Sequence, residues 1–351
     1  MDLMLSADQE AIQQTVRSFL EKELAMARVR TLADAGPEAL EPVWRAAGEL
    51  GFFGLGVSDA QGGAGYAITE EMVLFEELGR ALAPGPWLGT VLAAHALARQ
   101  TGAELAAARQ RILAGELHVA LVERSGAPTL HVANGRVSGE RANVAGANGA
   151  GALLILDDAG IAFVPCKPGA VTIEPRPSMD PTRTIARVTL RDAPCAILAS
   201  DRETAAAVGR EATVLACAEA VGGIQRTVEM SVEYSKVRHQ FGKPIGSFQA
   251  VKHRCADMAM RAEAARSAMT YAVVSVRDGA ADAAFQAAVA KILCANAYLQ
   301  NAADNVQNHG GMGFTWECDA HLYVKRARSF ELTLGSRQRQ LDFIVEQFRA
   351  A

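Results

Sequence analysis

The spacing of apolar residues predicts helices in the first third of the chain. From residue 1 to about residue 115, apolar side chains recur at intervals of three and four, which is the period of one helix face. Ser6 and Gln9 are placed to form a capping box, and Val16 and Phe19 follow on one face of the helix that it would begin. Further helices are expected near residues 40–50 and 69–82.

The pattern changes near Leu117. From there to about Ser200 the apolar runs are short, and Gly, Asn, Asp and Pro separate them. Such runs are typical of antiparallel strands in a small barrel or sandwich. The expected strands are LHVALVE, TLHVA, ALLILD, IAFVP, VTIEP and TIARVTL.

Helical spacing returns at about Thr204 and continues to the end of the chain. We expect helices near residues 204–236, 247–278, 281–308 and 319–349, with KPIGS and HGGMG as breaks. Four long helices with short connections favour an antiparallel bundle. The predicted fold is therefore α+β and mostly helical, with an N-terminal helical domain (1–115), a middle antiparallel β-barrel or sandwich domain (116–200) and a C-terminal four-helix bundle (201–351).

Charge and composition exclude several classes of protein. The 35 Lys and Arg residues nearly balance the 39 Asp and Glu residues, so no global field favours nucleic acid or an anionic membrane surface. We find no signal peptide and no apolar stretch of the roughly 18 residues that cross a bilayer. The six cysteines lack any CxxC and the seven histidines lack ligand spacing. These features predict a cytoplasmic, globular protein without a metal.

A cationic segment, Tyr234 to Met258, is the first candidate binding site. Arg238 and Lys243 lie near its start, and Phe241 and Phe248 stand among the charges. A helix end with fixed cations can hold a phosphate or pyrophosphate group, and an aromatic ring beside it can pack against an adenine. The alternative interpretation is a solvated, charged helix surface.

A glycine-rich segment, Val306 to Tyr323, is the second candidate. Its QNHGGMG run places Gly310 and Gly311 after Gln307. Glycines allow a backbone to approach a ligand closely, and the glutamine amide can contact a polar group. The alternative is a helix C-cap followed by a loop.

Together, the two segments resemble the C-terminal domain of acyl-CoA dehydrogenases. In that family RxxFG, IxxFQ and QxxGGxG recur on a helical bundle, and this chain has RHQFG, IGSFQ and QNHGGMG. The N-terminal LGFFGLGVSDAQGGAG is similar to the family's LGxxGLxxPxxxGGxG. The resemblance covers essentially the whole chain, including the order of helical, β and helical regions.

The resemblance implies an FAD flavoprotein that assembles as a homotetramer or dimer of dimers, with FAD at subunit interfaces. Arg238 and Phe241 would contact the pyrophosphate and adenosine region of FAD. The other side of the same half would be lined by Gln307, Gly310 and Gly311. Flanking contacts would come from Phe248, Gln249 and Val251.

The resemblance also implies a catalytic carboxylate, which removes the α-proton of an acyl thioester while hydride leaves the β-carbon for the flavin. Counted from Gly310 at the family's spacing, this position is Leu334, which cannot take a proton. Some relatives carry the glutamate on the first bundle helix, at positions that fall on Ala212 and Thr213 here. Glu211, one residue away, and Glu331, about one turn before Leu334, remain as candidate bases.

The flavin half of the family's site also looks eroded. The family's TEPxxGSD loop corresponds to LVERSGAP, and its KxWITN element corresponds to RANVAGANGAG. The resemblance therefore extends to the small, degenerate subunit of heteromeric α2β2 acyl-CoA dehydrogenases, some of which act on steroid side chains or dicarboxylyl-CoA.

Three functions follow from these observations. The first is a subunit without a base in a heteromeric FAD-dependent acyl-CoA dehydrogenase. The second is a self-sufficient homo-oligomeric enzyme with a relocated glutamate base. The third is a non-catalytic interaction protein on the same fold.

Overall fold

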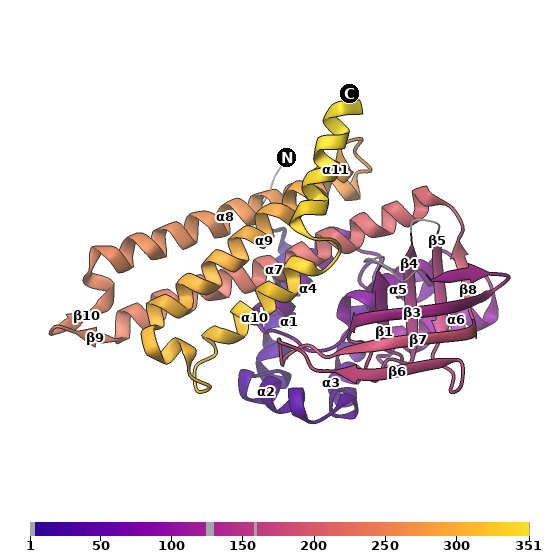
Figure 1. Cartoon of the computed structure of the whole chain (residues 1–351), viewed down its shortest axis with the longest axis horizontal. Helices are drawn as coiled ribbons and strands as arrows, with labels where there is room; N and C mark the ends of the chain where they lie inside the picture. The colour runs from indigo at the N-terminus through magenta and orange to yellow at the C-terminus, as the bar shows by residue number, and fades with distance from the viewer. Residues whose placement is uncertain (1–3, 124–129, 158–159, 351) are drawn as a thin grey trace. The chain divides into compact units, whose positions relative to one another are not determined.

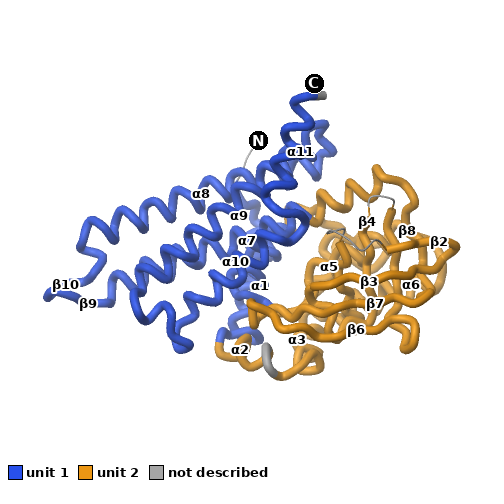
Figure 2. Tube along the Cα trace, in the orientation of Figure 1, with its two compact units in different colours: residues 1–26, 72–83, 213–351 blue, residues 27–71, 84–212 orange. Residues whose placement is uncertain are grey.

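The computed structural model describes residues 4–123, 130–157 and 160–350 of the chain (Figure 1). The chain divides into two compact units (Figure 2). Unit 1 comprises Met1–Met26, Met72–Ala83 and Thr213–Ala351, and unit 2 comprises Ala27–Glu71 and Pro84–Ala212. Each unit is thus built from segments that are far apart in the sequence. The domain boundaries near residues 115 and 200 stay a prediction.

Unit 1 is helical. Its helices are α1 (Ala7–Glu23), most of α4 (Ile68–Arg80), most of α7 (Arg202–Val237), α8 (Gln249–Arg277), α9 (Ala283–His309), α10 (Ala320–Leu332) and α11 (Arg337–Ala350). The predicted capping box is confirmed at the start of α1, where Gln9 N donates to Ser6 Oγ at 3.2 Å and Ser6 N donates to Gln9 Oε1 at 3.0 Å. None of the helices in the described ranges combines the length and the apolar composition that a bilayer crossing requires.

The last predicted helix is wrong as a single element, because it breaks into α10 and α11. Thr333 is extended (ψ 134°), and Leu334 and Gly335 have positive φ (57° and 96°). A leucine in the left-handed region is costly, by roughly 1–2 kcal/mol, so tertiary contacts must hold this turn. The side-chain amide Nε2 of Gln340 donates to Leu334 O at 3.0 Å, and Lys291 Nζ of α9 donates to Phe330 O near the end of α10.

Two glycines let α4 and α7 cross in unit 1 at very short distance. A Cβ on Gly222 would lie 1.7 Å from Glu76 O, and a Cβ on Gly79 would lie 1.7 Å from Glu219 O. Neither position can therefore carry a side chain unless the helices separate. The crossing brings charged side chains of α4 against those of α7.

Unit 2 combines short helices with two four-stranded sheets. Its helices are most of α2 (Met26–Asp34), α3 (Glu41–Glu49), α5 (Trp87–Ala98) and α6 (Ala103–Leu113). Its strands are β1 (Val119–Glu123), β2 (His131–Ala133), β3 (Arg136–Ala145), β4 (Ala152–Asp157), β5 (Gly160–Pro165), β6 (Val171–Arg176), β7 (Ile185–Pro194) and β8 (Ala196–Ala199). The sheet orders are β1-β4-β5-β8 and β2-β3-β7-β6. One apolar core draws residues from both sheets, among them Leu153 and Val188.

The arrangement corrects two expectations for the β region. In the described residues the strands of this region form two open four-stranded sheets. The predicted barrel is therefore wrong, and the two sheets fit the predicted sandwich. The pair β1 and β4 is parallel, although antiparallel strands were expected throughout. The intervening chain passes through β2 and β3 of the other sheet, and this crossover returns β4 in the direction of β1. The polar strand β3 was missed because it carries no apolar run.

Candidate functional site

The cationic segment folds into a hairpin that follows α7. Its strands β9 (His239–Gln240) and β10 (Lys243–Pro244) pair antiparallel, and the turn between them consists of Phe241 and Gly242, both with positive φ (51° and 77°). Two such residues make the type of two-residue turn that suits a hairpin. The turn leaves the Phe241 ring 90% exposed, with its nearest aromatic neighbour, Phe248, edge-on at 6.0 Å.

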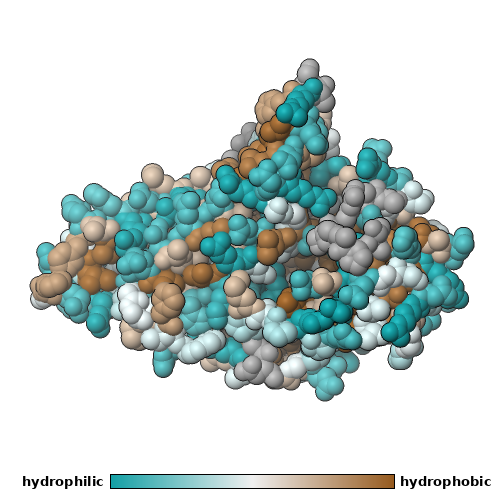
Figure 3. Space-filling model, in the orientation of Figure 1, coloured by the Kyte–Doolittle hydropathy of each residue, from teal (hydrophilic) through white to brown (hydrophobic). Residues whose placement is uncertain are grey.

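Arg238 is fixed by its backbone and free at its side chain. Its N–H donates to Tyr234 O at 2.9 Å, and its carbonyl accepts from Ile245 N at 2.8 Å. The exposed guanidinium makes no hydrogen bond or ion pair with any residue in the described ranges. An unpaired cation and an exposed aromatic ring therefore share one hairpin. Figure 3 shows apolar surface at the end of the molecule that carries this hairpin.

The glycine-rich segment lies at the same end of the bundle. The ring of Tyr234 stacks on the ring of His309 at 4.3 Å between centroids and an interplanar angle of 23°. Tyr234 is one turn before Arg238, and His309 follows Gln307 by two residues, so the contact brings the two predicted segments together. Gln307 is exposed on the last turn of α9.

The other predicted contacts lie in the same region. Gly310 and Gly311 are exposed in the 3-10 turn Gly310–Phe314, and Phe248 and Gln249 begin α8. Arg254 of the cationic segment, unlike Arg238, has a partner within the bundle. Its Nη1 donates to Asn308 Oδ1 at 3.0 Å, which links α8 to α9. The structure thus gathers the predicted cofactor residues at one end of unit 1, where Arg254 is paired within the bundle.

The predicted base position is the turn between α10 and α11. Leu334 occupies it and offers no titratable group. Glu331, the neighbouring candidate, is paired with Arg328 on the same helix at 3.2 Å. The nearest carboxylate in sequence is therefore part of an ordinary i,i+3 pair.

Glu211, the other candidate base, is held in an ion network within unit 2. Its Oε1 accepts from Arg99 Nη2 at 2.9 Å, and its Oε2 lies 3.6 Å from His95 Nδ1. The other ring nitrogen of His95 lies 2.7 Å from Glu71 Oε1, which also accepts from Gly56 N at 3.1 Å. His95 and Glu71 are buried.

The network sets unusual charge states. Burial alone would raise the pKa of Glu211, but the neighbouring imidazolium of His95 and the guanidinium of Arg99 outweigh it and lower the pKa to about 2. Burial would likewise lower the pKa of His95, but the two glutamates outweigh it and raise the pKa to about 10. A carboxylate with such a low pKa is a weak base, which argues against Glu211 in that role.

Sequence reasoning missed His95. It stands alone in an apolar helix, WLGTVLAAHALA, where its only signal is the four-residue spacing to Arg99. Glu71, which completes the network, belongs to α4 and is linked to His95 only by the fold.

Comparisons with known proteins agree with the whole-chain resemblance. The family model for the acyl-CoA dehydrogenase N-terminal domain matches residues 6–115, and the model for the C-terminal domain matches residues 206–348. The acyl-CoA dehydrogenase IpdE2 of Mycobacterium tuberculosis is 33% identical over 94% of this chain and 93% of its own length. FadE34 of the same organism is 35% identical over 96% of this chain, which spans only 47% of FadE34.

Among solved structures, the ChsE4–ChsE5 complex from Mycobacterium tuberculosis contains a chain that matches with a TM-score of 0.88 and 26% identity, over all of both chains. A chain of the Tcur3481–Tcur3483 steroid ACAD variant matches with the same TM-score and identity. Both structures are named for two different proteins.

Proposed function

Because the chain belongs to the acyl-CoA dehydrogenase family, we propose that it is the subunit without a catalytic base in a heteromeric FAD-dependent enzyme. Enzymes of this family are oxidoreductases that act on acyl-CoA. In the proposed assembly a related subunit supplies the base and the flavin pocket. This chain completes the site for the nucleotide half of FAD.

The observation that carries the proposal is the turn at Leu334. Its backbone keeps a costly left-handed conformation, yet its side chain cannot remove a proton. The two alternative carboxylates are engaged elsewhere, Glu331 with Arg328 and Glu211 with Arg99 and His95. A self-sufficient enzyme would need one of these carboxylates to leave its partners.

The cofactor assignment is supported by the hairpin after α7. Phe241 has positive φ, which is costly for a bulky residue, and its side chain stays 90% exposed with only an edge contact to Phe248. The exposed Arg238 guanidinium has no partner among the residues that the structure describes, which suits it to a pyrophosphate. We assign Arg238 and Phe241 to one side of the FAD nucleotide half, and Gln307, Gly310 and Gly311 to the other. Bound FAD would accept the hydride.

The partner and substrate classes follow from relatives. Two solved structures with similar chains are named for pairs of different proteins, and one of these names includes a steroid ACAD. The partner would be another acyl-CoA dehydrogenase-like chain. The substrate would be a bulky acyl-CoA, derived from a steroid or a dicarboxylic acid.

The test uses the visible spectrum of the chain alone and mixed with its partner, each with added FAD. We expect the chain alone to stay colourless and the mixture to become yellow and to reduce a dye with acyl-CoA. The variant Arg238→Ala should lower flavin retention by the mixture about tenfold or more, since a charge-assisted contact to phosphate is lost. Arg45→Gln, an exposed arginine paired only at 3.8 Å in unit 2, is the matched control.

The other outcomes select the alternatives. A yellow, active chain without a partner would establish the self-sufficient enzyme, and Glu211→Gln and Glu331→Gln would then identify its base. Failure of every mixture to bind flavin would leave the non-catalytic interaction protein. Unchanged flavin content in Arg238→Ala would overturn the cofactor assignment.

A further inference from the structure

A hollow of about 300 Å³ lies in unit 1, between α1, the end of α4, α7 and the start of α10. Its apolar lining includes Leu20, Leu24 and Met230, and its polar lining combines three arginines with acidic residues and Tyr323. This size is at the lower end of small-molecule sites. It uses none of the residues assigned to FAD.

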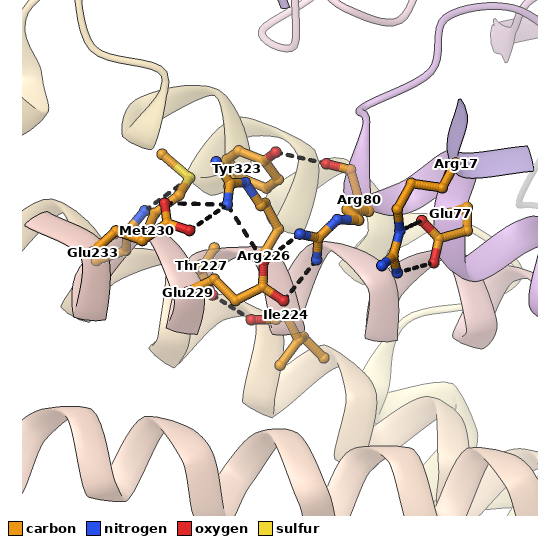
Figure 4. Close-up of polar contacts among 11 residues, drawn as sticks. Arg17, Glu77, Arg80, Ile224, Arg226, Thr227, Glu229, Met230, Glu233 and Tyr323 are labelled. Carbon is orange, nitrogen blue, oxygen red and sulfur yellow. Dashed lines mark hydrogen bonds and ion pairs between the residues drawn. The ribbon is translucent and has the colours of Figure 1, made fainter. Parts of the chain in front are cut away.

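Two of the three arginines at the hollow form bidentate pairs with glutamates (Figure 4). Arg17 binds Glu77 through Nε at 2.9 Å and Nη2 at 2.6 Å. Arg80 binds Glu229 through Nη1 at 2.7 Å, with Nη2 also in contact. Both pairs are bidentate, so a glutamate already occupies one edge of each of these two guanidinium groups.

Arg226 is the exception. Only its Nη1 is used, at 3.3 Å to Glu229 and 3.4 Å to Glu233, which is long for charge-assisted bonds. Its Nε and Nη2 make no hydrogen bond within the described residues. The neighbouring Tyr323 hydroxyl donates to Arg80 O at 2.7 Å, and burial raises the pKa of Tyr323 far above its usual range, so the phenol supplies no negative charge.

We propose that this hollow binds a small aliphatic carboxylate. The carboxylate lies on the Nε and Nη2 edge of Arg226, where two parallel hydrogen bonds match its oxygens. The hydrocarbon tail packs on Leu20, Leu24 and Met230. Glu21 and Asp319 also line the hollow, so the competing ligand class is an aliphatic amine, and the test must decide between the two signs of charge.

The experiment is calorimetric titration of the full chain with octanoate, octylamine and 1-octanol. We expect octanoate to bind at least about tenfold more tightly than 1-octanol, because the alcohol lacks the bidentate contact. Octylamine should bind no better than the alcohol. Equal or tighter binding of octylamine, or no binding of octanoate, would overturn the proposal.

Variants locate the site. Arg226→Gln should weaken octanoate binding about tenfold or more, and Arg226→Lys should restore only part of it, since lysine lacks the fork. Met230→Trp keeps every charge but fills the hollow, so it should abolish binding. Arg328→Gln, on the exposed side of α10, is the control. If octanoate binds Arg226→Gln and Met230→Trp as it binds the parent, with both variants folded by circular dichroism, the site is elsewhere.

Discussion

At the scale of single residues, one imidazole between two carboxylates determines the chemistry available in unit 2. Both ring nitrogens of His95 face carboxylate oxygens, from Glu71 at 2.7 Å and Glu211 at 3.6 Å. Only the cationic imidazole carries a proton on each nitrogen and can satisfy both. The buried cation in turn keeps Glu211 ionised. The same contact thus stabilises the fold and withdraws a candidate base from catalysis.

The network predicts how stability depends on pH. Protonated His95 stabilises the folded chain. This stabilisation is fully present below the pKa of about 6.5 that His95 has in the unfolded chain. It is lost as pH rises through about 10, the pKa in the folded chain. The stabilisation from Glu211, whose pKa is lowered, is fully present above the ordinary pKa of 4.5 and is lost as pH falls through about 2. We therefore expect the largest contribution between about pH 4.5 and pH 6.5.

The measurement is denaturant unfolding of the parent and His95→Gln at several pH values. Near pH 6 the variant should lose about 3–5 kcal/mol, because the buried Glu71 remains without its cation and Glu211 keeps only Arg99. The difference should shrink steadily toward pH 10. The exposed His131→Gln is the control, and a His95→Gln difference that does not change with pH would show that the histidine is uncharged at neutral pH.

At the scale of elements, two glycines allow α4 and α7 to cross closely. The close approach at Gly222 and Gly79 allows α4 to contact α7 along its charged face, where Arg80 Nη1 of α4 donates to Glu229 Oε1 of α7 at 2.7 Å. Helix propensity alone would favour alanine at both positions, by about 1 kcal/mol. Packing therefore overrides propensity at this crossing.

This crossing predicts opposite effects for two substitutions in the same helix. Gly222→Ala places a methyl group on Glu76 O and should lower stability by about 1–3 kcal/mol. Among the described residues, the methyl group of Gly209→Ala would come within 4 Å of Leu156 Cδ2 alone, at 3.9 Å, so this variant should be neutral or stabilising by up to about 1 kcal/mol. Thermal unfolding midpoints compare the two variants directly. A Gly222→Ala midpoint at or above that of Gly209→Ala would contradict the close crossing.

At the scale of the whole molecule, several large aromatic side chains are mostly exposed to solvent. Phe241 is 90% exposed, Phe314 83% and Trp316 65%. All three belong to, or directly follow, the two segments that Tyr234 and His309 bring together. Exposed aromatic residues of this kind are typical of interfaces, which agrees with a cofactor site that a second chain completes.

The proposed assembly predicts its own stoichiometry. A complex in which only one kind of subunit holds flavin should contain one FAD for every two chains. Native mass measurement combined with flavin absorbance, on the co-purified complex, gives this ratio. One FAD per chain would indicate that this chain has a complete site of its own.

The sequence by itself determined the helix–β–helix order, the capping box at Ser6, the family and the absence of a carboxylate at Leu334. These features depend on local spacing or on short motifs, so they can be read one segment at a time. The tertiary structure decided the parallel pairing of β1 and β4, the break before α11, the network around His95 and the hollow at Arg226. Each of these joins residues that are distant in sequence, and which partner a charged or strained residue finds depends on packing that no local pattern encodes.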